Sequence, residues 1–206
     1  MTDIPRLVFG WVGTQSPLTA AAVLGAGLLS GFYGFRMARL LIAAGTAVLA
    51  CVAASYLPDS LAVPREAAMV IAAVGGVAIG AAFRRASVVL LSAATFCAVG
   101  LYISALTGLR GWPALIPAAL FGSAAAALAM VSTGPMTMLY TTVQGALLIV
   151  GGAAGLAGAY LTPVAETFQK WVNSGSLIVP ILLGMVTVMA YSVQATKRQG
   201  DLVTGR

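Results

Sequence analysis

The sequence predicts an all-α integral membrane protein, a bundle of seven transmembrane helices with little chain outside the bilayer. Hydrophobic residues make up 60% of the 206 residues and charged residues only 8%, whereas soluble globular domains carry about 25% charged residues. The apolar residues also form long uncharged runs, as membrane-spanning helices do. A lipid-exposed chain must satisfy its own backbone hydrogen bonds, and these runs lack the alternation of barrel strands, so helices are expected.

Seven apolar segments result when the chain is divided at its charges and prolines. They cover residues 17–35, 40–57, 67–83, 86–106, 114–131, 136–161 and 176–193. At about 1.5 Å per residue each segment reaches roughly 25 to 39 Å, which is enough to cross the hydrocarbon. The predicted organisation is an outer-face segment with the pattern of an interfacial helix, a seven-helix transmembrane domain and a basic cytoplasmic tail. These parts cover residues 1–16, 17–193 and 194–206.

The charges predict that the N-terminus lies outside and the C-terminus inside. The N-terminus and the loops after the second, fourth and sixth segments carry four basic and four acidic residues. The opposite side carries seven basic residues and one acidic residue, so the whole net charge of +6 lies there. Because basic residues mark the cytoplasmic loops of membrane proteins, we expect multi-pass insertion in the cell membrane, with a bacterial inner membrane as the compartment.

A weak internal repeat predicts how the helices pair. Phe35-Arg36 recurs as Phe83-Arg84 at the inner turns, and prolines open successive units 47 to 50 residues apart. Three helical hairpins of consecutive segments plus one further helix are therefore expected. The alternative is that membrane hairpins have similar lengths without any duplication.

Small residues recur four positions apart in the first and third segments. They are Gly27, Gly31, Gly76 and Gly80. Such ridges let neighbouring helix backbones approach closely. They are expected either to pack inside the bundle or, where they face lipid, to form the surface of a homo-oligomer.

The residue types do not support enzymatic chemistry or a metal site. There is no histidine, and no predicted span holds a pair of carboxylates for acid–base work. Cys51 and Cys97 lie singly in apolar runs, where buried thiols are expected, so neither a zinc site nor another cofactor is predicted. The basic residues form no run with interleaved aromatics, so nucleic acid is not an expected partner. No charge lies within a predicted core, which argues against proton-coupled transport.

The most polar stretch inside a span opens the sixth segment. It comprises Tyr140, Thr141, Thr142, Gln144 and Gly145. The amide of Gln144 must find hydrogen bonds within the bundle. It is expected either to clamp two helices, or to line a polar cavity or pore together with its neighbours. Candidate partners for a clamp are Thr46, Ser92 and Thr95.

Two pairs of arginines lie at the predicted inner turns. They are Arg36, Arg39, Arg84 and Arg85. The simpler interpretation is that they set the topology and attract anionic lipid loosely. The sharper one is a specific site for a phosphate or lipid headgroup. Membrane lipids are therefore the expected partners.

An amphipathic stretch separates the sixth and seventh segments. Val164, Phe168, Trp171 and Val172 are spaced so that they share one face of a helix. This pattern predicts a short helix that lies on the outer membrane interface.

The end of the first segment and the start of the sixth also suggest a family. The stretch from Gly31 to Arg36 reads Gly-Phe-Tyr-Gly-Phe-Arg, and Thr141-Thr142-Val143-Gln144-Gly145 precedes a glycine-rich run. The chain resembles the seven-span family typified by transmembrane protein 198, which has a Gly-aromatic-Arg turn after its first span and Thr and Gly in its sixth. The resemblance implies seven helices, the same orientation, and a scaffold or assembly role. A seven-span trimeric cation channel family has similar length, but its expected Gly-Gly-Gly stretch followed by Arg-Asp is absent.

Together these observations predict a non-enzymatic, small multi-span membrane protein with a scaffold, assembly or lipid-organising role. The alternative is a channel or facilitator for an ion or small solute, with a pathway lined by the sixth helix.

Overall fold

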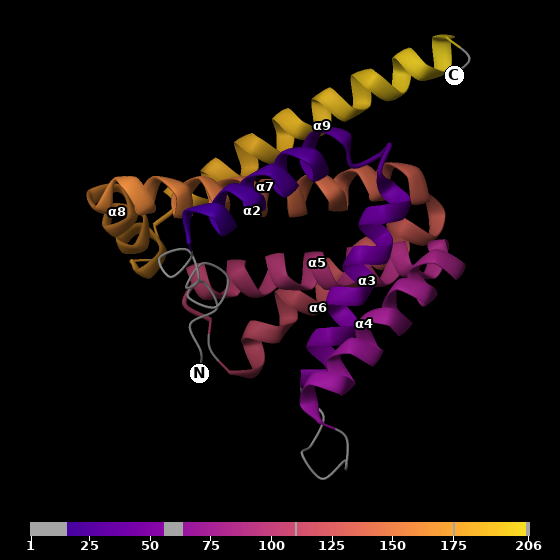
Figure 1. The fold of residues 1–206 in the computed structure, drawn as a ribbon, viewed down its shortest axis with the longest axis horizontal. Helices are drawn as coiled ribbons and strands as arrows, with labels where there is room; N and C mark the ends of the chain where they lie inside the picture. Colours follow the sequence, from indigo (N-terminus) through magenta and orange to yellow (C-terminus); the bar gives the residue numbers. More distant parts are fainter. Residues whose placement is uncertain (1–15, 56–63, 110, 175, 205–206) are drawn as a thin grey trace.

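A computed structural model of the chain describes residues 16–55, 64–109, 111–174 and 176–204, and all their regular secondary structure is helical. In chain order the helices are α2 (Pro17–Tyr33), α3 (Ala38–Ser55), α4 (Arg65–Ala82), α5 (Arg84–Leu106), the 3-10 turn η1 (Trp112–Ala114), α6 (Leu115–Val131), α7 (Thr133–Tyr160), α8 (Thr162–Asn173) and α9 (Ile178–Thr204). Figure 1 shows them as a bundle with α9 along one edge.

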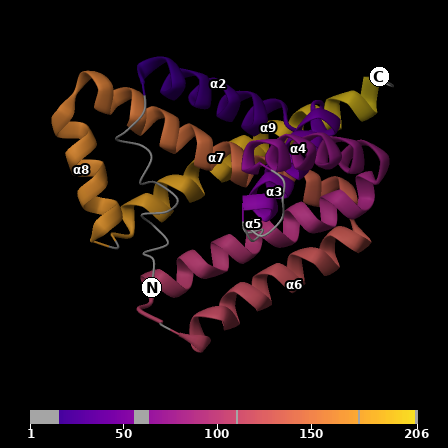
Figure 2. The same cartoon turned by 60° about the horizontal axis from the view of Figure 1, so that its bottom comes forward.

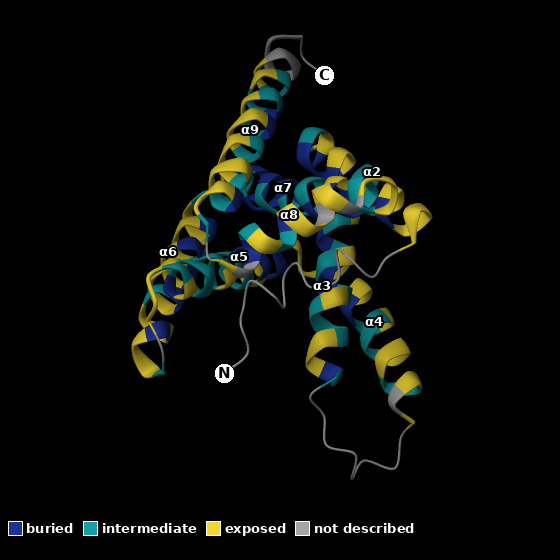
Figure 3. Ribbon diagram, turned by 90° about the vertical axis from the view of Figure 1, so that its left-hand side faces the viewer, coloured by how far each residue is buried: buried dark blue, intermediate teal, exposed yellow. Residues whose placement is uncertain are grey.

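Five of these helices are long and apolar enough to cross a membrane. They are α3, α5, α6 together with η1, α7, and residues 178–199 of α9. The two remaining apolar helices, Pro17–Tyr33 and Glu66–Ala82, are shorter. The prediction of a helical membrane bundle is confirmed at this level. Many large apolar residues of the helices are exposed, and Figure 3 shows exposed positions along the outer sides of the helices, as expected of helices surrounded by lipid.

The first helix begins where local chemistry predicts. The Ser16 hydroxyl accepts a hydrogen bond from the Thr19 N–H at 3.2 Å, and Pro17 occupies the first turn. A serine cap followed by proline is a strong helix start, because the cap satisfies a free N–H and proline has none to satisfy. The predicted outer-face segment 1–16 otherwise lies outside the described residues.

The helices pair differently from the predicted hairpins of consecutive segments. The three closely packed pairs are α3 with α4, α5 with α6, and α2 with α7 (Figures 1 and 2). The predicted pairings of the first segment with the second, the third with the fourth and the fifth with the sixth are therefore wrong. The reason is steric: the small residues that permit close approach face each other across these three pairs.

The glycine ridges are used inside the chain. A Cβ on Gly76 would lie 2.7 Å from the Ala47 Cα of α3, and one on Gly27 would lie 2.7 Å from the Ile149 N of α7. Gly31 and Gly80 are likewise buried, against α7 and α3. The surface expected for a homo-oligomer through these four glycines is thus occupied within the protein. This corrects the prediction for these glycines.

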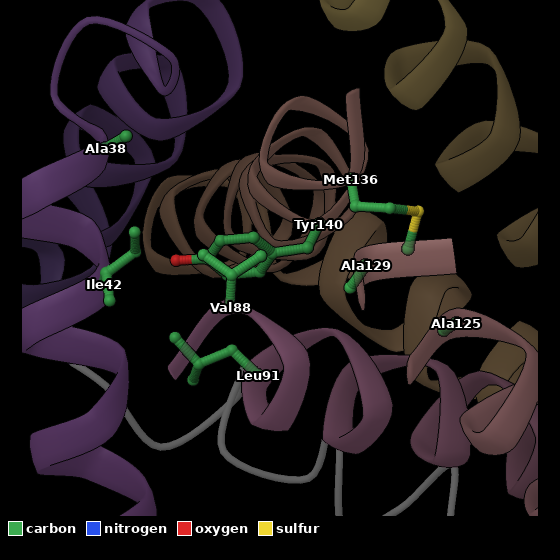
Figure 4. Packing of buried hydrophobic residues seen from close by; sticks show 8 residues of the cluster. All are labelled: Ala38, Ile42, Val88, Leu91, Ala125, Ala129, Met136 and Tyr140. Atoms are coloured by element: carbon green, nitrogen blue, oxygen red, sulfur yellow. The ribbon is translucent and has the colours of Figure 1, made fainter. Parts of the chain in front are cut away.

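The main core joins four helices around Tyr140 of α7 (Figure 4). Its buried members are Ala38, Ile42, Val88, Leu91, Ala125, Ala129, Met136 and Tyr140. Most are small or branched, so α3, α5 and α6 all come close to α7. Among the candidate spans α7 has the largest buried share, which makes it the central helix.

A second core holds α8 against the bundle. Phe168 and Val172 are 6% and 3% exposed and pack with Ala154 of α7 and Val179 of α9. The amphipathic helix predicted for this stretch is confirmed, but these two side chains point into the protein. Val164 alone of the predicted face remains 44% exposed.

The predicted boundary between the transmembrane domain and a basic tail falls inside a helix. Residues 194–204 continue α9 without a break, and Gln194 is only 2% exposed. The start of the predicted tail therefore packs as part of the bundle. Gln194 is buried although it lies close to Lys197 and Arg198 in sequence, because the end of α2 packs against it.

Candidate functional site

The clearest pocket lies where α2 ends and α9 passes, and it is called here the α2–α9 pocket. It is lined by Phe32, Tyr33, Phe35, Arg36, Gln194, Lys197 and Arg198, and it is a shallow, open pocket whose enclosed volume is only about 10 Å³. Among its described lining residues, three are cations and none is a carboxylate. Four of these residues come from the end of α2 and its turn into α3, and three come from one face of α9.

Gln194 fixes the two segments together. Its side-chain Oε1 accepts a hydrogen bond from the Phe35 N–H at 3.2 Å, while Nε2 donates to the carbonyls of Ser30 at 3.3 Å and Gly31 at 2.6 Å. The last carbonyls of a helix have no partner within the helix. Gln194 therefore acts as a cap for α2 supplied by α9, and it is an interhelical polar clamp.

A second polar contact ties the same end of α2 to α7. The Ser30 hydroxyl donates to the Thr141 carbonyl at 3.2 Å. A Cβ on Gly34 would collide with the Thr141 side chain and the Ser30 carbonyl, at 2.6 Å from the Thr141 Cβ. The turn after α2 thus needs glycine for close approach, and the floor of the pocket is rigidly built.

Aromatic rings hold two of the three cations. The Lys197 Nζ lies 3.8 Å from the centre of the Tyr33 ring, and the Arg198 guanidinium carbon lies 5.4 Å from the centre of the Phe35 ring. These distances suit cation–π attraction. A ring orients a cation without neutralising it, so both side chains keep their charge for a ligand.

Arg198 also lies against the first turn of α7. Its guanidinium is 3.4 Å from where a Cβ on Gly134 would stand, and it approaches the Met138 sulfur at 3.9 Å. The Ser132 hydroxyl does not cap this helix start, because it donates to the Leu128 carbonyl. The start of a helix carries partial positive charge, so positive potential accumulates here.

The predicted polar stretch of α7 is mostly engaged in packing. Thr141 and Thr142 are fully buried, and their hydroxyls donate to the carbonyls of Met138 and Leu139 in their own helix. Gly145 is in backbone contact with α2, since a Cβ there would lie 2.5 Å from the Gly31 Cα. These three residues stay together, but at a helix contact.

Tyr140 and Gln144 are the members of that stretch whose polar groups have no hydrogen-bond partner among the described residues. The Tyr140 hydroxyl is buried and points toward Ile42 in Figure 4. Gln144 is half-buried one turn further along α7. The clamp to Thr46 is not made, because the single hydroxyl proton of Thr46 is shared among nearby carbonyls, of which that of Gly76 in α4 is the nearest at 2.7 Å. Ser92 is buried with its hydroxyl unpartnered in the described part of the chain.

The four predicted arginines stand at one end of the bundle. Arg36 lines the α2–α9 pocket, Arg39 is exposed in the first turn of α3, and Arg84 and Arg85 are exposed at the start of α5. Because α3 and α4 are packed together, the first turn of α3 lies near the junction of α4 and α5. This end, called here the basic end, also carries Lys197 and Arg198.

Sequence reasoning missed Gln194, Lys197 and Arg198 as site residues. The signal was present, since aromatic residues cluster at the end of the first segment and two cations follow a glutamine in the last. As for metal ligands, no group of three or more His, Cys, Asp or Glu side chains occurs in the described ranges.

The chain matches no family model, and neither a curated protein nor a solved structure is found similar to it. The resemblance to the transmembrane protein 198 family stays a prediction.

Proposed function

We propose that this chain is a non-enzymatic, multi-pass membrane protein that organises anionic lipid at the cytoplasmic leaflet, as a small scaffold. The observation that carries the proposal is the basic end. Exposed Arg39, Arg84 and Arg85 stand there beside a cation-lined pocket, while the opposite end is neutral in sequence. Anionic lipids attract such clusters by about 1 kcal/mol per basic residue near the surface.

The proposal includes seven spans with the N-terminus outside. Pro17–Tyr33 and Glu66–Ala82 each hold 17 residues, which is about 26 Å of helix and near the lower limit for a span. Counting both as spans brings all the net charge to one side, which the positive-inside rule assigns to the cytoplasm. The basic end then faces the leaflet with the anionic surface.

Lipid selectivity in proteoliposomes tests this function. The purified protein is reconstituted in phosphatidylcholine with spin-labelled phosphatidylglycerol, and the immobilised fraction of the label measures lipid held at the protein surface. We expect phosphatidylglycerol to be preferred over labelled phosphatidylcholine, and the preference to fall in the triple variant Arg39→Gln, Arg84→Gln, Arg85→Gln. Three cations at about 1 kcal/mol each limit the preference to about a hundredfold.

Two controls make that result specific. The corresponding triple lysine variant keeps the charge and should keep the preference. Lys170→Gln removes one exposed cation from α8, away from the basic end, and should leave the preference unchanged. An unaltered preference in the triple glutamine variant would refute the proposed function.

A channel or facilitator is the second candidate, and one observation favours it. The Tyr140 hydroxyl and the Gln144 amide lack hydrogen-bond partners among the described residues, and unpaired polar groups in a membrane interior are costly unless water or a solute meets them. This candidate predicts solute flux in proteoliposomes that falls in Gln144→Leu and Tyr140→Phe. Equal flux in wild type, variants and protein-free vesicles would remove it.

A further inference from the structure

We infer that the α2–α9 pocket is a stoichiometric binding site for the phosphate of an anionic phospholipid headgroup. This inference rests on the proposed function, because it needs the basic end to face a lipid leaflet. It goes further in placing one lipid molecule at Lys197 and Arg198. The predicted cluster of four arginines contributes only Arg36 to this site.

The pocket offers the charge that a phosphate needs. Lys197 and Arg198 of α9 lie on one side of it, Arg36 lies on the other, and none of its described lining residues is a carboxylate. Arginine and lysine bind phosphate through short, charge-assisted hydrogen bonds. Lys197 and Arg198 lie over the rings of Tyr33 and Phe35. A ring, unlike a carboxylate, does not accept strong hydrogen bonds from these N–H groups, so they can donate to a phosphate.

The pocket is also built before any ligand arrives. Gln194 is buried and uses both ends of its amide to fix α9 to the end of α2. Lys197 and Arg198 lie one turn further along the same helix, so their positions are set by that clamp. A preformed site binds more tightly because less conformational freedom is lost on binding.

An anion would relieve a local electrostatic cost. The Arg198 guanidinium lies against the first turn of α7, beside Gly134 and Met138. A cation at the start of a helix is in unfavourable contact with the positive end of the helix dipole, whereas an anion there is favourable. A phosphate between Arg198 and Lys197 would be attracted by both cations and by the helix.

The walls of the pocket favour a lipid over free phosphate. Phe32, Tyr33 and Phe35 contribute three aromatic rings beside the cations. Aromatic side chains are preferred at the level of lipid headgroups, where one side is apolar and the other wet. Their apolar faces match a phosphodiester that continues into glycerol and acyl chains, and inorganic phosphate has no apolar part to use them.

The test measures binding of short-chain lipids to the full-length protein in neutral detergent, by isothermal titration calorimetry. The probes are dioctanoyl phosphatidylglycerol, dioctanoyl phosphatidylcholine and sodium phosphate. We expect saturable binding of about one phosphatidylglycerol per chain, and weak binding of the other two. Arg198→Gln and Lys197→Gln should each weaken phosphatidylglycerol binding about tenfold, the usual effect of losing one charge-assisted hydrogen bond.

Matched variants separate a specific site from general attraction and from misfolding. Lys170→Gln removes the same charge away from the basic end and should change affinity less than about twofold, and Arg84→Gln and Arg85→Gln should weaken binding less than the two pocket variants do. Arg198→Lys should recover most of the binding lost in Arg198→Gln. Unfolding curves of all variants show whether the fold is kept. Gly134→Ala is a nearby substitution that keeps every charge, because its added Cβ would lie 3.4 Å from the Arg198 guanidinium.

Three results would overturn the inference: no saturable binding of phosphatidylglycerol, equal weakening by Arg84→Gln and Arg198→Gln, or equal affinity for sodium phosphate. The second result would leave the proposed function standing as loose attraction at the basic end. The opposite combination is also distinguishable. If the wild-type protein binds phosphatidylglycerol saturably in detergent but shows no preference for it in vesicles, the pocket is supported and the proposed function is refuted.

Discussion

Replacing Gln194 by leucine should destabilise the bundle more than any other glutamine-to-leucine change in the described spans. The substitution keeps the volume and removes three hydrogen bonds, to the Phe35 N–H and to the carbonyls of Ser30 and Gly31. Interhelical hydrogen bonds in membrane proteins contribute about 0.6 kcal/mol on average and about 1.7 at most. The expected loss is therefore about 2 kcal/mol, with about 5 as the upper limit, and 2 kcal/mol is roughly a 30-fold change in the folding equilibrium.

Reversible unfolding in mixed micelles of a mild detergent and dodecyl sulfate, followed by far-ultraviolet circular dichroism, measures this loss. Gln199→Leu is the matched control, because Gln199 is exposed on the same helix. Gln144→Leu should also cost little, since the Gln144 amide has no partner among the described residues. A loss below about 0.5 kcal/mol for Gln194→Leu, within the usual range of surface substitutions, or a larger loss for Gln144→Leu, would refute the reasoning.

Three further predictions use the same unfolding titration or hydrogen exchange. Gly145→Ala should lower the free energy of unfolding by about 1 to 3 kcal/mol, because its added Cβ overpacks the α2–α7 contact. Gly25→Ala, with nothing within 4 Å of the added Cβ, should be neutral or stabilising by up to about 1 kcal/mol. Equal effects of the two substitutions would contradict the packing. Phe168→Ala should lower hydrogen-exchange protection across α8 by about 3 kcal/mol, while exposed Val164→Ala should not, and protection unchanged in both would mean that α8 is undocked. Tyr140→Phe removes a buried hydroxyl without a partner in the described chain and should be neutral or slightly stabilising; a loss above about 1 kcal/mol would reveal a bound water or solute there.

The helices were predictable from sequence because apolar runs and breaks are local features. The 17-residue helix that begins at Pro17 starts at the predicted position, with the Ser16 cap one residue before it. The break at Arg84 was also visible as a pair of charges between two apolar runs. Both signals depend only on neighbouring residues.

The pairing of helices was not predictable, because it depends on which ridges meet. Loop lengths suggest that consecutive helices lie together, yet α2 packs on α7 across more than a hundred residues of chain. The ridge at Gly27 and Gly31 correctly predicted that another helix packs closely on α2. A ridge of small residues does not indicate which helix that is. Gly145 on α7 supplied that partner.

The candidate site shows the same limit. The position of Gln144 deep in an apolar run predicts a site residue, whereas the position of Gln194 beside two cations predicts the start of a solvated tail. What decides between them is where another helix ends. The unpaired carbonyls at the end of α2 need a donor, and Gln194 is the glutamine that reaches them.

The orientation of the basic end is the most direct test of the proposed function. Single cysteines at Arg85 and at Glu166, each exposed, are introduced into a chain in which Cys51 and Cys97 are alanine, and intact cells are treated with a membrane-impermeant maleimide. We predict that position 166 is labelled in intact cells and that position 85 is labelled only after permeabilisation. Labelling of position 85 in intact cells would place the basic end outside and contradict the proposal.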